Sequence, residues 1–154
     1  MKTSKRGIDM IIAFEGMELK AYKCPAGVWT IGVGHTGTVH GQPVKQGMEI
    51  SKELAEWLLE KDLELVESYL SNQPFAQRLK QKEFDALVSF IFNVGKGAFV
   101  TSTMRKKLCL GAPAEEVADE FPKWVYGTII NGKKEQLPGL VARRERERER
   151  FLES

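Results

Sequence analysis

Cysteine, histidine and long apolar runs are all scarce in this chain of 154 residues. Its two cysteines, Cys24 and Cys109, are too few for a disulfide framework and lack the spacing of metal ligands, so we expect free thiols and no metal site. No stretch approaches the ~20 apolar residues that a membrane span needs. The sequence therefore gives no sign of a disulfide-stapled fold, a cysteine-based metal site or a membrane-spanning helix.

A large excess of one charge sign is also missing. The chain carries 23 Lys and Arg against 21 Asp and Glu, a formal net charge of +2. This excess is too small for a protein held to nucleic acid mainly by charge. With 42% hydrophobic and 29% charged residues, the composition is that of one globular domain spanning residues 1–154, with at most two lobes.

The N-terminal segment superficially resembles an export signal, because three basic residues precede an apolar run from Ile8 to Phe14. Asp9 interrupts this run and Glu15 ends it, so it is too short and too charged for a signal. Ser4 as an N-cap and Gly16 as a stop instead predict a short amphipathic helix. We therefore expect synthesis in a reducing cytosol, without an export route encoded in the chain itself.

Changes in residue composition and hydrophobic pattern along the chain predict its remaining secondary structure. Residues 16–50 are rich in glycines, β-formers and turn residues, which predicts a small antiparallel sheet with turns at 25–27 and 36–37. Residues 51–71 predict a connecting helix, about 30 Å long. Its expected inward positions are Leu54, Leu58, Leu65 and Tyr69. Residues 72–154, together with the N-terminal helix, predict a larger helical lobe. Its expected helices are 83–94, 102–110, 114–124 and one from Pro138, with a loop through Gly127 and 131–132.

The sequence RRERERER near the C-terminus, residues 143–150, alternates in charge. In a helix, this alternation places opposite charges at i,i+3 and like charges at i,i+4, so the net benefit is small. We expect this run to form a solvated helix face.

Alternation also describes the segment Trp29–His35. In an extended strand, Thr30, Gly32 and Gly34 share one face, where a ligand could approach the backbone closely. The opposite face is apolar and ends in His35, which we interpret as a hydrogen-bonded structural histidine. The glycines could equally mark bulges.

Glu15 is the first candidate for chemistry. It ends an apolar helix beside Phe14, where the helix dipole and apolar surroundings both favour a protonated carboxyl group. A general acid needs such a group at neutral pH, although an ordinary surface glutamate is the alternative. Cys24, before Pro25, reads as an inert thiol, mostly protonated at pH 7.

The segment FEGMELKAYKCPAGVWTIGVGHTG resembles the active-site region of phage-type lysozymes, glycoside hydrolase family 24. The family pattern is Glu, eight residues, Asp or Cys, five residues, Thr. Glu15, Cys24 and Thr30 match this pattern without a spacing error. ALVSFIFNVGKGAF and LPGLVARRERE also resemble the family, in the expected order, so the resemblance covers nearly the whole chain.

The resemblance implies an α+β, lysozyme-like, mainly helical fold. A small antiparallel-sheet lobe would be joined by a long helix to a larger helical lobe, with a cleft between them. It also implies an endolysin that hydrolyses the β-1,4 bond between N-acetylmuramic acid and N-acetylglucosamine in bacterial peptidoglycan and so lyses the host cell. No metal or organic cofactor is expected.

Roles for the three motif residues follow from this chemistry. Glycoside hydrolysis usually employs two carboxyl groups, of which only Glu15, the expected general acid, is present. Thr30 and Cys24 would hold the attacking water, so that attack from the opposite face inverts the anomeric carbon. Direct attack by a Cys24 thiolate, with retention, is the alternative and needs a lowered thiol pKa.

The resemblance also points to substrate contacts at Thr36, Phe92, Asn93 and Ser102. Phe92 could instead belong to the core, and Ser102 could be an N-cap. In addition, His35 should form a structural ion pair with Asp62, which lies on the connecting helix.

Two other functions remain open from the sequence. One is a non-catalytic module that binds peptidoglycan or scaffolds a partner on the same fold, and the other is a lytic transglycosylase that leaves an anhydro sugar. For the hydrolase, we expect a monomer made in the host bacterial cytoplasm. It would reach the cell wall in the periplasm only when a separately encoded holin permeabilises the membrane.

Overall fold

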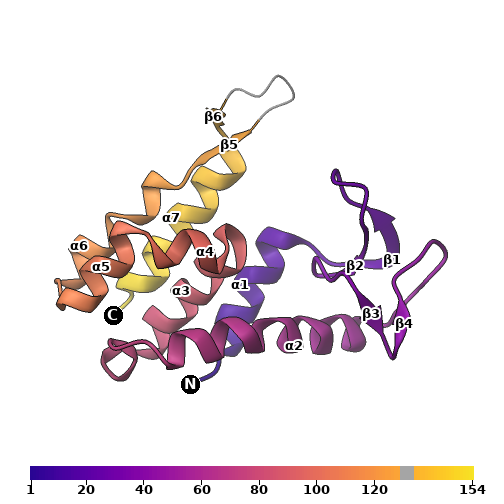
Figure 1. The fold of residues 1–154 in the computed structure, drawn as a ribbon, viewed down its shortest axis with the longest axis horizontal. Coiled ribbons are helices and arrows are strands. Elements are labelled where there is room, and N and C mark those ends of the chain that lie inside the picture. Colours follow the sequence, from indigo (N-terminus) through magenta and orange to yellow (C-terminus); the bar gives the residue numbers. More distant parts are fainter. Residues whose placement is uncertain (129–133) are drawn as a thin grey trace. The chain divides into compact units, whose positions relative to one another are not determined.

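The computed structural model describes residues 1–128 and 134–154 (Figure 1). In chain order the elements are α1 (Lys5–Glu15), β1 (Glu18–Lys23), β2 (Trp29–Gly32), β3 (Thr38–Val39), β4 (Gln42–Pro43), α2 (Lys52–Ser71), η1 (Ala76–Arg78), α3 (Gln81–Val94), α4 (Lys96–Val100), α5 (Thr103–Leu110), α6 (Ala114–Ala118), η2 (Phe121–Lys123), β5 (Tyr126–Thr128), β6 (Lys134–Gln136) and α7 (Pro138–Leu152). The predicted mixture of many helices and short antiparallel strands is present.

The chain divides into two compact units. The sheet unit comprises Ile8–Leu65, and the helical unit comprises Met1–Gly7 together with Val66–Ser154. The sequence predicts that the whole N-terminal helix belongs to the helical lobe and that 51–71 is a separate connector. In this division, most of α1 and the first part of α2 belong with the sheets.

The sheet unit contains two antiparallel hairpins, β1–β2 and β3–β4. A small core of buried side chains holds them against the start of α2. Its members are Ile31, Val39, Val44 and Leu58, with Ala21, Trp29, Met48, Ile50 and Leu54 packed around them. The glycines, β-formers and turn residues of 16–50 therefore predicted this sheet-forming region correctly.

The predicted extended strand over Trp29–His35 is wrong beyond Gly32. Gly32 and Gly34 have φ values of 68° and 67°, and Ile31 and His35 exchange both backbone hydrogen bonds at 2.9 Å across the turn between them. Only glycine adopts these angles without strain, so the chain reverses here instead of alternating. A Cβ at Gly32 would lie 3.5 Å from the Cβ of Ala55 on α2. Gly32 is therefore packed against α2, and the expected open, ligand-facing surface is not formed there.

The helix α2 begins where the sequence predicted, since the Ser51 hydroxyl accepts a hydrogen bond from the Leu54 N–H at 3.1 Å. Leu58 is buried as expected. The prediction for Leu65 is wrong, because its side chain is 82% exposed. Leu63, two residues earlier and on the opposite face of the helix, is fully buried instead.

The helical unit is built around α3 and α7, which pack against each other (Figure 1). Phe90 on α3 lies at the centre of an aromatic cluster. Its ring makes edge contacts with Phe99, Phe121 and Trp124, with centroid distances of 6.4, 5.4 and 5.5 Å. Such edge-to-face pairs add to the stabilisation that burial alone gives.

Two predicted boundaries in this unit are wrong. The helix expected over 114–124 is split into α6 and η2, because Pro122 lacks the N–H that a continuous helix needs. The loop expected around Gly127 contains the antiparallel hairpin β5–β6. Asn131 and Gly132 lie outside the described residues.

The charged C-terminal run is not a solvated face. Arg143, Arg144, Glu147 and Arg150 are each less than a tenth exposed. The Glu147 carboxylate accepts from Arg143 Nε at 3.1 Å and from Arg144 Nη1, and Ser89 Oγ donates to it at 2.6 Å. These charges can be buried because each is paired. Their partner Ser89 lies on another helix, so the charge pattern of α7 alone does not predict the burial.

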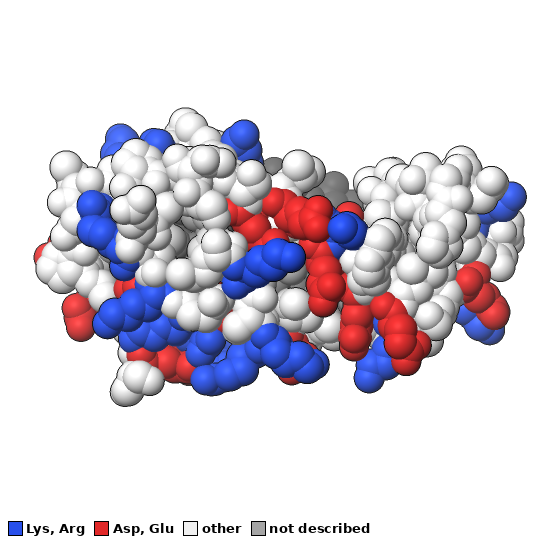
Figure 2. Space-filling view, turned by 90° about the horizontal axis from the view of Figure 1, so that it is seen from below, with Lys and Arg blue, Asp and Glu red and all other residues white. Residues whose placement is uncertain are grey.

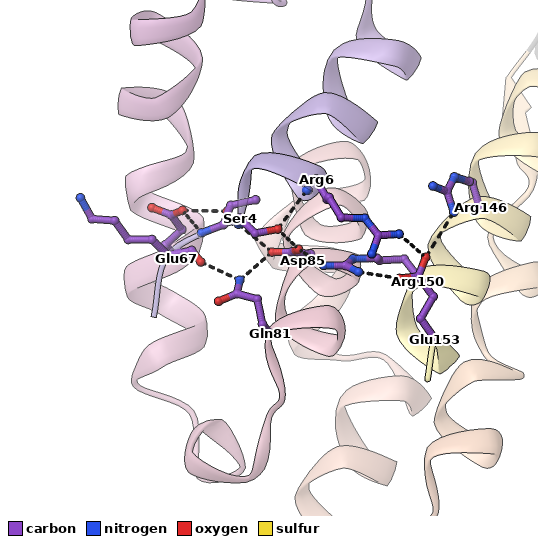
Figure 3. Close-up of polar contacts among 11 residues, drawn as sticks. Ser4, Arg6, Glu67, Gln81, Asp85, Arg146, Arg150 and Glu153 are labelled. Atoms are coloured by element: carbon purple, nitrogen blue, oxygen red, sulfur yellow. Dashed lines mark hydrogen bonds and ion pairs between the residues drawn. The ribbon is translucent and has the colours of Figure 1, made fainter.

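A second buried charge, Asp85 on α3, ties both chain ends together (Figure 3). Its carboxylate accepts from the Ser4 N–H at 2.9 Å, from the Ser4 hydroxyl, from Gln81 Nε2 at 2.8 Å and from Arg150 Nη2 at 2.7 Å. A Cβ at Gly7 would lie 2.7 Å from the Asp85 Cγ. Glycine in the first turn of α1 therefore makes room for this carboxylate.

Acidic and basic side chains lie next to one another on the face drawn in Figure 2, in keeping with the small net charge. In the described part of the chain, no helix is long and apolar enough to cross a membrane.

Candidate active site

Glu15 is the last residue of α1, and its side chain is half-buried. Gly16 follows with a φ of 77° and donates its N–H to the Ile12 carbonyl at 2.8 Å, which ends the helix as predicted. The Glu15 carboxylate lies beside the β2 turn, since its Oε2 is 3.7 Å from the position that a Cβ on Gly34 would occupy. A side chain at position 34 would therefore contact this carboxylate.

Cys24 and Thr30 come together through the β1–β2 hairpin. Tyr22 pairs with Thr30 and Lys23 with Trp29, and the Cys24 N–H continues the ladder by donating to the Val28 carbonyl at 3.0 Å. Alternation along paired strands then places Tyr22, Cys24 and Thr30 on one face. Cys24 is partly exposed, whereas Thr30 is 4% exposed and its hydroxyl lies 3.0 Å from the Val28 carbonyl oxygen.

The turn after β1 changes the chemistry of the Cys24 sulfur. Hydrogen bonds from the backbone N–H groups of Val28 and Ala26 lower the pKa of this thiol, and the Thr30 hydroxyl adds a smaller effect in the same direction. The pKa of Cys24 therefore departs from that of the ordinary thiol that the sequence predicts, in the direction of the thiolate.

Tyr22 belongs to this cluster, although sequence reasoning missed it. Burial raises the pKa of its phenol, and the negative charges of Glu18, Cys24 and Glu15 raise it further. Tyr22 therefore lies within electrostatic reach of both Glu15 and Cys24. Its register opposite Thr30 is the signal that could have identified it, but that register depends on where the hairpin turns.

The predicted contact between His35 and Asp62 is present. His35 Nδ1 lies 2.8 Å from Asp62 Oδ2, and its Nε2 lies 2.8 Å from the Thr38 carbonyl oxygen. Both acceptors belong to the sheet unit, so the imidazole links the β2 turn to β3 and to α2.

Comparisons with known proteins agree with this arrangement. The family model described as phage lysozyme matches residues 12–147. The endolysin of Acyrthosiphon pisum secondary endosymbiont phage 1 is 41% identical over 98% of this chain and 98% of its own length. The endolysin of Salmonella phage P22 is 42% identical over 99% of both chains. The chain belongs to the phage lysozyme family.

The fold supports the same assignment. A crystal structure of a P22 lysozyme variant aligns with a TM-score of 0.86, at 42% identity over 99% of both chains. The lysozyme-like α+β class is thereby confirmed, and so is the prediction of an endolysin-type hydrolase that acts on peptidoglycan.

The four residues predicted to contact substrate are found in both units of this phage lysozyme family member. Thr36 is exposed in the sheet unit, just after His35. In the helical unit, Phe92 is half-buried and Asn93 is exposed at the end of α3. Ser102 is buried, donates to the Phe99 carbonyl at 2.7 Å and accepts from the Arg105 N–H at 3.1 Å, so it is the N-cap of α5. Contacts of all four with substrate stay predictions.

Among the described residues, no group of three or more His, Cys, Asp or Glu side chains could hold a metal ion.

Proposed function

We propose that this enzyme cleaves the β-1,4 bond between N-acetylmuramic acid and N-acetylglucosamine, with Glu15 as the general acid. The observation that carries the proposal is that Tyr22, Cys24 and Thr30 share one face of the β1–β2 hairpin and that Tyr22 lies within electrostatic reach of Glu15. Glu15 is the only carboxyl group at the spacing of the family motif, and its carboxylate lies beside the glycine turn at Gly34. It would donate its proton to the leaving oxygen as the bond breaks.

Cys24 and Thr30 would supply the second half of the reaction. A thiolate accepts a hydrogen bond from water, and a threonine hydroxyl can donate or accept one. Together they would orient a water for attack on the face opposite Glu15, with inversion at the anomeric carbon. The lowered pKa of Cys24 supports this role, because a thiolate accepts a stronger hydrogen bond from the attacking water than a neutral thiol does.

The same lowered pKa meets one requirement of the alternative, in which the thiolate itself attacks the carbon and configuration is retained. NMR of the first products distinguishes the two, since inversion gives the α-anomer and retention gives the β-anomer. In the water-holding mechanism, Cys24→Asp should stay active and Cys24→Ala should lose most activity. An alanine variant as fast as the parent would remove Cys24 from both mechanisms.

Glu15→Gln tests the proposal most directly. We expect it to fold normally and to lose nearly all lysis of outer-membrane-permeabilised Gram-negative cells, because glutamine is nearly isosteric but delivers no proton. Substantial lysis by the folded variant would remove Glu15 from the reaction. Mass spectrometry of digested peptidoglycan should show hydrated reducing ends, whereas anhydro ends would indicate a transglycosylase and an absence of cleavage would indicate a binding module.

We also propose that this monomeric enzyme is made in the host cytoplasm and reaches the wall when a separate holin opens the membrane. The N-terminal segment supports this, because Ile11 is fully buried and Ser4 is bonded to Asp85, so the segment is part of the fold. Expressed alone, the chain should leave culture turbidity steady until chloroform is added. Lysis before chloroform that depends on the host secretion machinery would contradict the proposal, and sedimentation would test the monomer.

A further inference from the structure

The helical unit contains a pocket that lies outside the candidate active site. It is formed where η1, the start of α3, α5, α6 and the last turn of α7 meet, and the labels of α5 and α6 and the C-terminus mark this region at the left of Figure 1. Its volume is about 200 Å³. A pocket of this size suits a ligand smaller than drug-sized molecules. All of its lining residues belong to the helical unit, whereas Glu15, Cys24 and Thr30 belong to the sheet unit.

Apolar side chains form most of the pocket wall. They are contributed by the two ends of η1 and by α5, α6 and α7, and each is less than a tenth exposed: Phe75, Leu79, Leu108, Val117 and Phe151. Apolar walls of this kind are filled more favourably by an apolar group than by water. The pocket therefore favours a ligand with a compact apolar part.

Two charged side chains complete the lining. The exposed Arg78 donates from Nη2 to the Leu108 carbonyl at 2.8 Å, which holds its guanidinium group at the pocket. The half-buried Glu83 accepts the Lys80 N–H through Oε1 at 2.8 Å. In the described part of the chain, neither side chain forms a salt bridge. The remaining guanidinium N–H groups and the second carboxylate oxygen are therefore available to a ligand.

The two charges restrict the charge of the ligand. Because both line the same small pocket, an anion that binds Arg78 comes near Glu83, and a cation that binds Glu83 comes near Arg78. Like charges brought together weaken binding. A ligand with both a carboxylate and an ammonium group satisfies both side chains. A free α-amino acid carries these two groups on one carbon, next to its side chain.

We propose that this pocket binds a free aliphatic α-amino acid as its zwitterion. The carboxylate pairs with Arg78, since a guanidinium group presents parallel N–H donors to a carboxylate. The ammonium group pairs with Glu83, and the aliphatic side chain lies against the apolar wall. This site goes beyond the proposed function and does not depend on it.

Amide NMR of the whole chain measures the binding, with L-leucine as the probe. Two analogues of nearly the same shape separate the charges, since 4-methylpentanoate lacks the ammonium group and 3-methylbutylamine lacks the carboxylate. A ligand of so few atoms should bind with a dissociation constant of about 1 mM. Both charged contacts lie near solvent, so leucine should bind about fivefold more tightly than either analogue. The backbone amides of Gly111 and Ala112, which line the pocket, should shift on binding.

Two variants assign the charges. Arg78→Gln should bind leucine about fivefold more weakly and should no longer distinguish leucine from 3-methylbutylamine. Glu83→Gln keeps an oxygen for the Lys80 N–H and should no longer distinguish leucine from 4-methylpentanoate. Lys106→Gln, which changes an exposed lysine on α5 outside the lining, is the matched control and should keep both preferences.

Ala114→Leu tests the pocket itself. Ala114 lines the pocket at the start of α6, and leucine is a good helix former, so the variant should fold while its larger side chain occupies the apolar space. A ligand that binds only the folded protein raises its melting temperature. Leucine should therefore raise the melting temperature of the parent and of Lys106→Gln, but not that of Ala114→Leu.

Three results would overturn the proposal. The first is that the amides of Gly111 and Ala112 show no saturable shift with leucine. The second is that either analogue binds the parent as tightly as leucine does, which would indicate a site for a simple charged amphiphile. The third is that Ala114→Leu binds leucine as the parent does. None of these measurements involves peptidoglycan, so a failure here is distinct from a failure of Glu15 in hydrolysis.

Discussion

His35 and Asp62 join two elements of the sheet unit through a 2.8 Å contact between Nδ1 and Oδ2. The histidine belongs to the glycine turn after β2, and the aspartate belongs to α2. Because the imidazole also reaches the Thr38 carbonyl, one side chain fixes three segments around the turn that lies beside Glu15.

Asp62→Ala should therefore destabilise the protein. The His35 side chain is largely buried, and removal of one partner of such a hydrogen bond costs about 1–3 kcal/mol of the free energy of unfolding. The neighbouring Glu64, in an exposed pair with Lys61, provides the control, and Glu64→Ala should cost less than about 0.5 kcal/mol. Urea unfolding measures both, and equal effects would contradict the structural role of the pair.

Cys24 should react with iodoacetamide at lower pH than an ordinary cysteine. Alkylation needs the thiolate, and a lowered pKa moves the midpoint of the rate-against-pH curve downward from the ordinary value. The measurement uses Cys109→Ala, which leaves Cys24 as the only cysteine. Adding Thr30→Val, which removes one hydroxyl donor at nearly constant shape, should move the midpoint back upward. A midpoint at or above that of a free cysteine peptide would contradict the hydrogen-bonding argument.

Ser102→Ala separates capping from substrate binding. The hydroxyl bonds within its own helix start, so its loss should cost about 1 kcal/mol of stability and leave kcat/KM of the folded enzyme unchanged. Ser51→Ala, at the start of α2, is a matched cap deletion in the other unit. If Ser102→Ala alone lowers kcat/KM at full folding, the predicted substrate contact would be supported.

Asp85→Asn should be far more damaging than a surface change. Asp85 is fully buried and pairs with Arg150 at 2.7 Å, and breaking such a pair costs about 3–5 kcal/mol because a charge is left buried without its partner. Asp119→Asn, which weakens an exposed pair with Arg148, should cost less than about 1 kcal/mol. Thermal unfolding of the two variants side by side provides the comparison.

The parts of the fold predicted well from sequence are those set by local signals. Ser4, Gly16 and Ser51 mark helix ends through their own side chains or backbone angles, and all three act as predicted. The burial of charged residues on α7 depends instead on contacts that are distant in the sequence. Their partners, Ser89 and Asp85, lie more than fifty residues away, so the alternating run carried no local sign that it would be buried.

The candidate site likewise combines residues that local sequence signals identify with properties that depend on the folded backbone. Motif spacing identified Glu15, Cys24 and Thr30. The contact between His35 and Asp62 was predicted from an extended strand that ends at Gly32, and it forms because the glycine turn also brings His35 to α2. The state of the Cys24 thiol could not be predicted, because it depends on where the turn directs the N–H groups of Ala26 and Val28. Tyr22 was missed for a related reason, since only the strand register places it opposite Thr30.

The contacts of Asp85 with Ser4 and Arg150, here called the clasp, also determine when the N-terminal segment can be fixed during biosynthesis. Ser4 binds Asp85, which is made 81 residues later, and Arg6 binds Glu153, which is made 147 residues later. The whole sheet unit is synthesised between them. At ordinary rates of translation, roughly ten seconds separate the two ends of the chain. Ser4 and Arg6 therefore gain partners that are made long after them, and a nascent chain that stops before Arg150 lacks one of the groups that bind Asp85. The finished hydrolase exists only once its final helix has been made.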